Sequence, residues 1–138
     1  MKHKILLLSA NYYKDISREL CADALNTLKE HGNVECDDMT SIPGVFEIPV
    51  LISRNIEKYD GFVALGCVIK GETPHFDFIS QATTNAIMNL SITHKKPIGN
   101  GILTCLNYDQ AKSRAATDGK KRKGREATQA VLQVLDSK

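Results

Sequence analysis

The chain has 138 residues, with 18 Lys and Arg against 16 Asp and Glu, a net charge of +2, 42% hydrophobic residues and four cysteines. This length predicts one domain over residues 1–138, and the ordinary apolar fraction and few cysteines exclude a disordered chain and a disulfide scaffold. The net charge itself indicates neither nucleic acid nor a membrane surface, but seven of the Lys and Arg residues lie within residues 112–125, beside one acidic residue.

A strand and a helix are predicted at the start of the chain. The continuous apolar run Ile5–Leu8 is typical of a strand buried on both faces. A helix is expected from Asp15 to His31, because Gly32 is a natural C-terminal stop and apolar residues recur at helical spacing. These apolar residues are Ile16, Leu20, Ala24 and Leu28.

A second strand and helix follow. Val34–Met39 predicts a weaker strand, which leaves through a turn at Ser41–Gly44. The next helix is predicted over Val45–Lys58, with Pro49 in its first turns, where proline is tolerated.

The second half of the chain repeats this alternation. The most apolar segment, Gly61–Ile69, predicts a central strand, and Thr73 and Pro74 are expected as the N-cap and first residue of the next helix. A fourth strand is expected over Pro97–Leu103, and a short helix over Tyr108–Ala115. The apolar stripes of the third helix and of a last helix are expected to be buried: Phe76, Ile79, Ala82, Ala86 and Leu90 in the former, and Ala127, Val131 and Val134 in the latter.

This alternation predicts a three-layer, flavodoxin-like α/β fold. Parallel strands need crossover helices, so a four-stranded parallel sheet with helices on both faces is expected. Ligands of such folds bind beyond the carboxyl ends of the strands. The candidate segments are therefore Ala10–Lys14, Ser41–Glu47, Cys67–His75 and Leu103–Asn107.

The cysteines and the N-terminal residues predict a cytoplasmic protein. Cys21, Cys36, Cys67 and Cys105 form no C-x-x-C pair, which favours free thiols in a reducing compartment. The first apolar run is too short for a signal-peptide core, and no stretch reaches the roughly 18 apolar residues of a membrane span. No membrane partner is therefore expected.

The segment Lys70–His75 carries the strongest chemical signal. Gly71 precedes a helix N-terminus, where free N–H groups and the positive end of the helix dipole favour an anion. His75, in the first turn, is then able to move protons beside that anion. The alternative is that His75 only packs on its neighbours.

Other candidate residues also have two interpretations. Glu47 either contacts a ligand or complements a helix dipole, and Tyr12 and Tyr13 either stack on a planar ligand or fill the surface and core. The basic tract either contacts nucleic acid or holds a small phosphorylated ligand. Its lack of interleaved aromatic residues favours the phosphorylated ligand. The chain has no P-loop and no G-x-G-x-x-G motif, so ATP and NAD are not supported.

Three segments together resemble the 6,7-dimethyl-8-ribityllumazine synthase family, which catalyses the penultimate step of riboflavin biosynthesis. The resemblance extends from Lys4 to about Val134. The matching segments are Pro43–Pro49, Ala64–Asp77, and Gly101–Thr104 with Gln110-Ala111 and Arg114-Ala115.

The resemblance implies a condensation of 5-amino-6-(D-ribitylamino)uracil with 3,4-dihydroxy-2-butanone 4-phosphate. The products are 6,7-dimethyl-8-ribityllumazine, phosphate and water, and no metal, organic cofactor or nucleic acid takes part. His75 falls on the family's proton-transfer histidine, while Glu72, Thr73, Arg114 and Lys123 fall at the phosphate. The residues expected at the pyrimidine and ribityl chain are Tyr12, Val45, Phe46, Glu47, Cys67, Val68, Ile69 and Asn100.

Three positions depart from the family's pattern. Asn11-Tyr12-Tyr13 stands where Arg-Phe-Asn is usual, and Asn100 stands where a neighbouring subunit commonly inserts a Phe onto the ligand. The loop after Arg114 is one residue longer than usual. The second basic residue at the phosphate is therefore one of three lysines: Lys120, Lys121 or Lys123.

The resemblance also implies a homo-oligomer. Family members form pentamers with sites between adjacent subunits, and some build sixty-subunit shells. Because the first strand begins almost at Met1, an isolated pentamer or a dimer of pentamers is expected. The rival interpretations are an archaeal-type riboflavin synthase, whose substrates carry no phosphate, and a catalytically silent flavin- or lumazine-binding module of the same fold.

Overall fold

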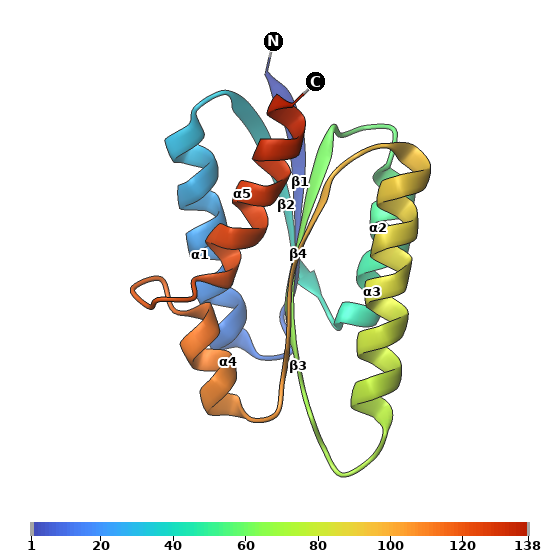
Figure 1. Ribbon diagram of the computed structural model, residues 1–138, viewed down its shortest axis with the longest axis vertical. Helices are drawn as coiled ribbons and strands as arrows, with labels where there is room; N and C mark the ends of the chain where they lie inside the picture. Colours follow the sequence, from blue (N-terminus) through green and yellow to red (C-terminus); the bar gives the residue numbers. More distant parts are fainter. Residues whose placement is uncertain (1, 138) are drawn as a thin grey trace.

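Four parallel strands form the middle layer of the computed structural model, which describes residues 2–137 (Figure 1). The strands are β1 (His3–Ala10), β2 (Val34–Ile42), β3 (Gly61–Ile69) and β4 (Ile98–Cys105), and their order in the sheet is β2-β1-β3-β4. This confirms the predicted three-layer, flavodoxin-like parallel sheet. The strand order reverses between β1 and β3, and a crevice for ligands is expected at the carboxyl ends of these two strands.

Helices cover both faces of the sheet, as predicted. One layer contains α1 (Lys14–His31), α4 (Tyr108–Ala115) and α5 (Lys123–Asp136). The other layer contains a 3-10 turn, η1 (Val45–Glu47), followed by α2 (Ile48–Asn55) and α3 (His75–His94). The α1 helix ends where predicted, because Gly32 takes the left-handed conformation with φ of 79° and donates its N–H to the Leu28 carbonyl.

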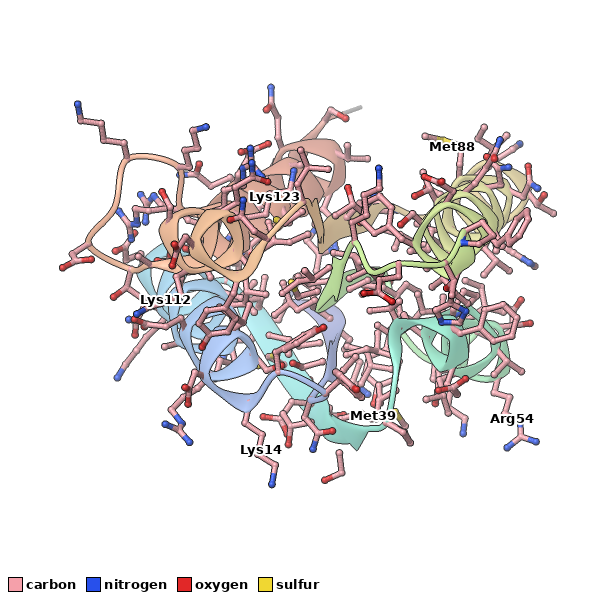
Figure 2. The ribbon with its side chains drawn as sticks, turned by 90° about the horizontal axis from the view of Figure 1, so that it is seen from below. Lys14, Met39, Arg54, Met88, Lys112 and Lys123 are labelled. Atoms are coloured by element: carbon pink, nitrogen blue, oxygen red, sulfur yellow. The ribbon has the colours of Figure 1, made fainter. Side chains whose placement is uncertain are left out.

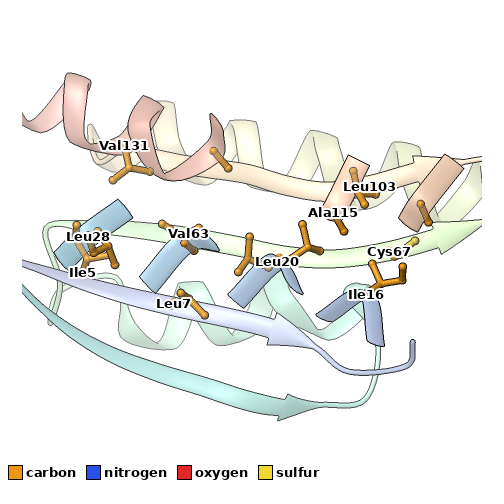
Figure 3. Packing of buried hydrophobic residues seen from close by; sticks show 14 of the residues in the cluster. Ile5, Leu7, Ile16, Leu20, Leu28, Val63, Cys67, Leu103, Ala115 and Val131 are labelled. Carbon is orange, nitrogen blue, oxygen red and sulfur yellow. The ribbon is translucent and has the colours of Figure 1, made fainter. Parts of the chain in front are cut away.

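Apolar residues of α1, α4 and α5 pack against one face of the sheet. Figure 3 shows Ile16 of α1 next to Cys67 of β3, and Leu28, near the other end of α1, next to Ile5 of β1. The predicted stripe of α1 is buried in full. In α5, Ala127 and Val131 are buried as predicted, but Val134 is exposed, because the buried side of this helix continues through Leu132 instead.

The α3 layer differs from the prediction. The buried residues of α3 are Thr83 and Ile87, whereas the predicted Ala82 is exposed. Ile79 and Leu90 are partly buried against the core, and Phe76 and Ala86 are half-buried. The helix has apolar residues on every side, so its periodicity did not identify the side that faces the sheet.

Several predicted boundaries also change. Strand β2 continues to Ile42, so the exit turn begins at Pro43. The helix predicted over Val45–Lys58 divides into η1 and α2 and ends at Asn55, with Pro49 in the first turn of α2. The N-cap of α3 is Pro74 rather than Thr73, although the Thr73 hydroxyl accepts the His75 N–H at 3.4 Å.

Candidate functional site

A cavity of about 450 Å³ lies at the carboxyl ends of β1, β2 and β3, where the strand order reverses. Figure 2 looks onto this edge of the sheet. The cavity brings together His75 and every residue expected at the pyrimidine and ribityl chain except Asn100. Its lining consists of Tyr12, Tyr13, Gly44, Val45, Phe46, Glu47, Cys67, Val68, Ile69, His75 and Ile79.

The exit of β1 holds two tyrosines in different environments. The Asn11 N–H donates to the Ile42 carbonyl at 2.9 Å, which fixes this exit against β2. Tyr13 packs against the buried core, and burial raises its pKa above the usual value near 10. Tyr12 is exposed, and the two rings meet edge to face at 4.9 Å between centroids. Tyr12 is therefore the ring of this pair that is available to a ligand.

The turn η1 brings Val45, Phe46 and Glu47 to the second wall of the cavity. Val45 approaches β3 so closely that a Cβ at Gly66 would stand 2.6 Å from the Val45 Cγ1, so glycine is required there. Phe46 remains exposed. Within residues 2–137 the Glu47 carboxylate makes no salt bridge or side-chain hydrogen bond, which leaves its oxygens available as acceptors for a bound polar ligand.

The end of β3 forms the floor. Cys67 is buried, and burial together with the neighbouring Cys105 raises the pKa of its thiol to about 12. At neutral pH this thiol is therefore uncharged and a poor nucleophile. Beyond Ile69, the Lys70 N–H donates to the Cys105 carbonyl at 2.9 Å, which ties the chain to β4 before it turns into α3.

The start of α3 places an exposed imidazole beside a group of free backbone donors. His75 is exposed and lines the cavity. Among residues 2–137, the N–H groups of Gly71, Glu72 and Thr73 find no backbone or side-chain acceptor. Glu72 and Thr73 do not line the cavity themselves, but they immediately precede His75. An anion held at these amides would lie next to a group that transfers protons.

A second cavity, of about 370 Å³, contains Arg114 and the basic residues expected at the phosphate. It is lined by Arg114, Lys120, Lys121, Lys123 and Glu126. The Lys123 Nζ lies 3.4 Å from a Glu126 carboxylate oxygen, whereas no acidic partner of Lys120 or Lys121 is found in residues 2–137. All three candidate lysines thus surround the same space, which has a strong positive charge.

The two cavities share no lining residue. Lys123 belongs to the α1, α4 and α5 layer, whereas His75 begins α3 on the opposite face of the sheet. Asn100 lines neither cavity: it is exposed on β4, at the edge of the sheet, and its Oδ1 accepts the Ile102 N–H at 3.1 Å. Within one chain, the basic residues predicted at the phosphate are therefore separate from the residues predicted at the pyrimidine.

Two arginines of the basic tract have a different role, which the sequence did not reveal. Arg122 donates two hydrogen bonds to Asp23, at 2.6 and 3.1 Å, and the Asp23 side chain is only 1% exposed. Arg125 pairs with Glu30 at 2.9 Å. Both pairs tie the start of α5 to α1. The partners of the first pair are 99 positions apart, so sequence spacing gave no signal of it.

Within residues 2–137, no group of three or more His, Cys, Asp or Glu side chains is arranged to hold a metal ion. In the same part of the chain, no helix combines the length and the apolar character that crossing a membrane requires.

Comparison with known proteins gives one consistent family. Residues 2–138 match the family model described as 6,7-dimethyl-8-ribityllumazine synthase. A protein of that name from Bartonella bacilliformis is 42% identical over 95% of this chain and 87% of its own length. The Agrobacterium fabrum protein of that name is 39% identical over 99% of this chain and 95% of its own. The one from Sulfurimonas denitrificans is 38% identical over 96% and 88%.

Proposed function

Because the chain belongs to the 6,7-dimethyl-8-ribityllumazine synthase family, and is thus a transferase of riboflavin biosynthesis, we propose the following reaction for it. Residues 1–138 act as one domain that condenses 5-amino-6-(D-ribitylamino)uracil with 3,4-dihydroxy-2-butanone 4-phosphate. The products are 6,7-dimethyl-8-ribityllumazine, phosphate and water. The observation that carries this proposal is the cavity at the switch between β1 and β3, which joins an exposed tyrosine, a free carboxylate and an exposed histidine.

The cavity fits a flat, polar pyrimidinedione with a hydroxylated side chain. Tyr12 supplies an exposed ring on which a planar ligand stacks. The Glu47 carboxylate accepts hydrogen bonds from ribityl hydroxyls, and the backbone at Cys67–Ile69 faces the ring. The uncharged Cys67 thiol beneath adds no competing nucleophile.

His75 is the proposed proton-transfer residue. The pyrimidine's amine attacks the butanone ketone and an imine forms with loss of water. Inorganic phosphate then leaves, and the ribityl-bearing nitrogen closes the ring with loss of water. Each step moves a proton, which an exposed imidazole at the cavity wall accepts and returns. Holding two substrates in register supplies most of the remaining acceleration.

The phosphate of the second substrate is proposed to bind where Arg114 and the free amides at Glu72 and Thr73 meet. One chain holds Arg114 and His75 in separate cavities, so a second copy must bring its Arg114 cavity to the His75 cavity of its neighbour. Head-to-tail contacts between copies form a ring when the rotation from each copy to the next closes on itself. We therefore propose a homo-oligomeric ring, a pentamer or a dimer of pentamers, whose sites lie between subunits.

The outer side of α3 supports an assembly. Phe78 is 68% exposed and Ile92 is 67% exposed, and Met88 is exposed between them. No Lys, Arg, Asp or Glu occurs from Phe78 to Thr93. An exposed helix without charge is typical of a surface that a partner covers.

The four free thiols support a location in the reducing cytoplasm, which is also part of the proposal.

The reaction is tested by mixing the purified protein with both substrates. Growth of lumazine absorbance together with equimolar release of phosphate is the expected result. Riboflavin formation from the lumazine alone would identify a riboflavin synthase instead. Ligand binding without turnover would identify a silent binding module.

The shared site is tested by complementation. His75→Ala and Arg114→Ala chains are each expected to be impaired alone. When they are co-expressed and co-purified as mixed rings, about a quarter of the interfaces combine an intact His75 with an intact Arg114 from the neighbour. Recovery of roughly that fraction of wild-type activity is expected. If both residues of a site came from one chain, no interface would be intact and no activity would return.

A further inference from the structure

The short helix α4 presents Gln110 and Arg114 one turn apart, next to the second cavity. Its start is fixed by Asn107, whose Oδ1 accepts the Gln110 N–H at 2.9 Å. Its inner side is fixed by Ala111 and Ala115, which are both fully buried. The backbone that carries the two side chains is therefore anchored at its beginning and along its length.

Among the residues that the structure describes, contacts to the guanidinium of Arg114 are made at a single nitrogen, NH1. Its NH1 group donates to the Gln110 Oε1 at 3.3 Å and to the Cys105 Sγ at 3.4 Å. The same Gln110 oxygen accepts the Leu106 N–H at 2.9 Å, so the amide itself is fixed to the backbone. No other partner of the Arg114 side chain is found within residues 2–137.

This arrangement leaves the edge of the guanidinium that is formed by Nε and NH2 free for a ligand. An arginine carries five N–H donors in a planar fork, and a phosphate is bound best by two parallel donors. With NH1 engaged by Gln110 and Cys105, the Nε and NH2 donors remain for a ligand. The lysines of the same cavity surround this side chain with further positive charge.

We propose that Gln110 is a positioning residue, which restrains NH1 so that the Nε and NH2 edge of Arg114 meets the substrate's phosphate. The inference rests on the proposed assignment of Arg114 to that phosphate. Gln110 itself does not touch the substrate. Its neutral amide orients the guanidinium and leaves its positive charge uncompensated, which a carboxylate at this position would not do.

The fold does not need the Gln110 oxygen. Its backbone partner belongs to Leu106, which is exposed, so water replaces the lost acceptor when the side chain changes. A Gln110→Met variant keeps the length of the side chain and removes the acceptor. A Gln110→Glu variant keeps the acceptor and places a negative charge against the guanidinium. The exposed Gln133 of α5 offers a matched control, Gln133→Met.

The test measures kcat, the KM for each substrate, and the affinity for inorganic phosphate by calorimetry. Gln110→Met is expected to raise the KM for the phosphorylated substrate about tenfold and to weaken phosphate binding by the same factor, because a charged hydrogen bond is lost. The kcat and the KM for the pyrimidine stay unchanged. Gln110→Glu, despite its conserved geometry, is expected to weaken phosphate binding more than Gln110→Met. Gln133→Met leaves all four values unchanged.

A double substitution separates the inference from the function on which it rests. If Gln110 acts through Arg114, then Gln110→Met has no further effect in the Arg114→Ala background. Additive effects, or unchanged phosphate affinity in Gln110→Met, would overturn the positioning role and leave the Arg114 assignment intact. If Arg114→Ala alone changed neither phosphate affinity nor the KM for the phosphorylated substrate, the phosphate assignment itself would be wrong.

Discussion

The two faces of the sheet are completed in different ways. On the α1, α4 and α5 face, apolar side chains fill the space against the sheet, and two arginines of α5 bind acidic residues of α1. On the α3 face, the helix buries only Thr83 and Ile87 and leaves Phe78 and Ile92 exposed. The apolar side chains of the α1, α4 and α5 face are buried within one chain. The α3 face instead leaves apolar side chains exposed, as is typical of a surface that forms an interface.

The largest expected effect concerns the cavity beside α3. His75→Ala should lower kcat by about 10² to 10⁴, because general acid–base assistance is lost, while leaving the midpoint of thermal unfolding unchanged. The exposure of His75 explains why stability is spared. Initial rates with both substrates measure the loss, and His94→Ala, at the other end of α3, serves as the control. A kcat within threefold of wild type would remove His75 from the proposed mechanism.

The next prediction compares one apolar residue from each face. Leu20→Ala, on the α1, α4 and α5 face, should lower the free energy of unfolding by about 3 kcal/mol, because it empties space that no neighbour fills. Ile92→Ala, on the exposed side of α3, should cost less than about 1 kcal/mol in the chain itself. Urea unfolding at several protein concentrations measures both.

The stability losses of the two variants should also differ in how they depend on protein concentration. The Leu20→Ala loss should be the same at every protein concentration, while any Ile92→Ala loss that reflects assembly should grow with protein concentration and shrink on dilution. Equal losses for the two variants at all concentrations would contradict the proposed difference between the faces.

The two ion pairs of the α1, α4 and α5 face should differ in strength. Arg122→Ala leaves the Asp23 carboxylate buried without its partner and should cost about 2 kcal/mol, less than for a fully buried pair because Arg122 is partly exposed. Arg125→Ala breaks a pair whose acidic partner, Glu30, is exposed, and should cost less than about 1 kcal/mol. Chemical denaturation of both variants gives the comparison, and equal costs would show that burial of Asp23 contributes nothing.

The last expected effect is a slope of stability with pH rather than a single loss. The folded protein holds the Cys67 proton up to about pH 12, whereas an unfolded thiol with a pKa near 9 releases it. The unfolded state therefore binds fewer protons above pH 9, and stability falls as the pH rises, by about 1.4 kcal/mol per pH unit for this thiol. Cys67→Ala should lose this component of the slope between pH 9 and 11. An unchanged slope would assign the alkaline loss to other groups.

Sequence patterns located the strands and helices well where one physical signal dominated. Gly61–Ile69 and Tyr108–Ala115 were predicted to the residue, and for the strand the reason is that a continuous apolar run bounded by glycine has few alternatives. The register of α3 was not predictable, since a helix that is apolar on both sides gives no single stripe. The side of α3 that faces the sheet is decided by packing around Thr83 and Ile87.

Only part of the candidate site could be predicted from the sequence. The residues around the first cavity follow from the rule that parallel strands place their carboxyl ends together, so Tyr12, Glu47 and His75 could be grouped from sequence. The basic tract could not be divided in this way. Arg122 and Arg125 look like their neighbours in sequence, and only the fold shows that their partners belong to α1.

The contact between Arg122 and Asp23 fixes one end of the segment that joins α4 to α5. The length of this segment can therefore change without moving the cavity that contains Arg114. Arg122 takes a left-handed backbone conformation, with φ of 32°, at the end of the segment that joins α4 to α5. At the other end, Ala115 is fully buried. The residues between these two anchors can therefore be exchanged or inserted while Arg114 and α5 keep their places. Residues 116–121 are a natural position for engineering the anion preference of the cavity, one lysine at a time.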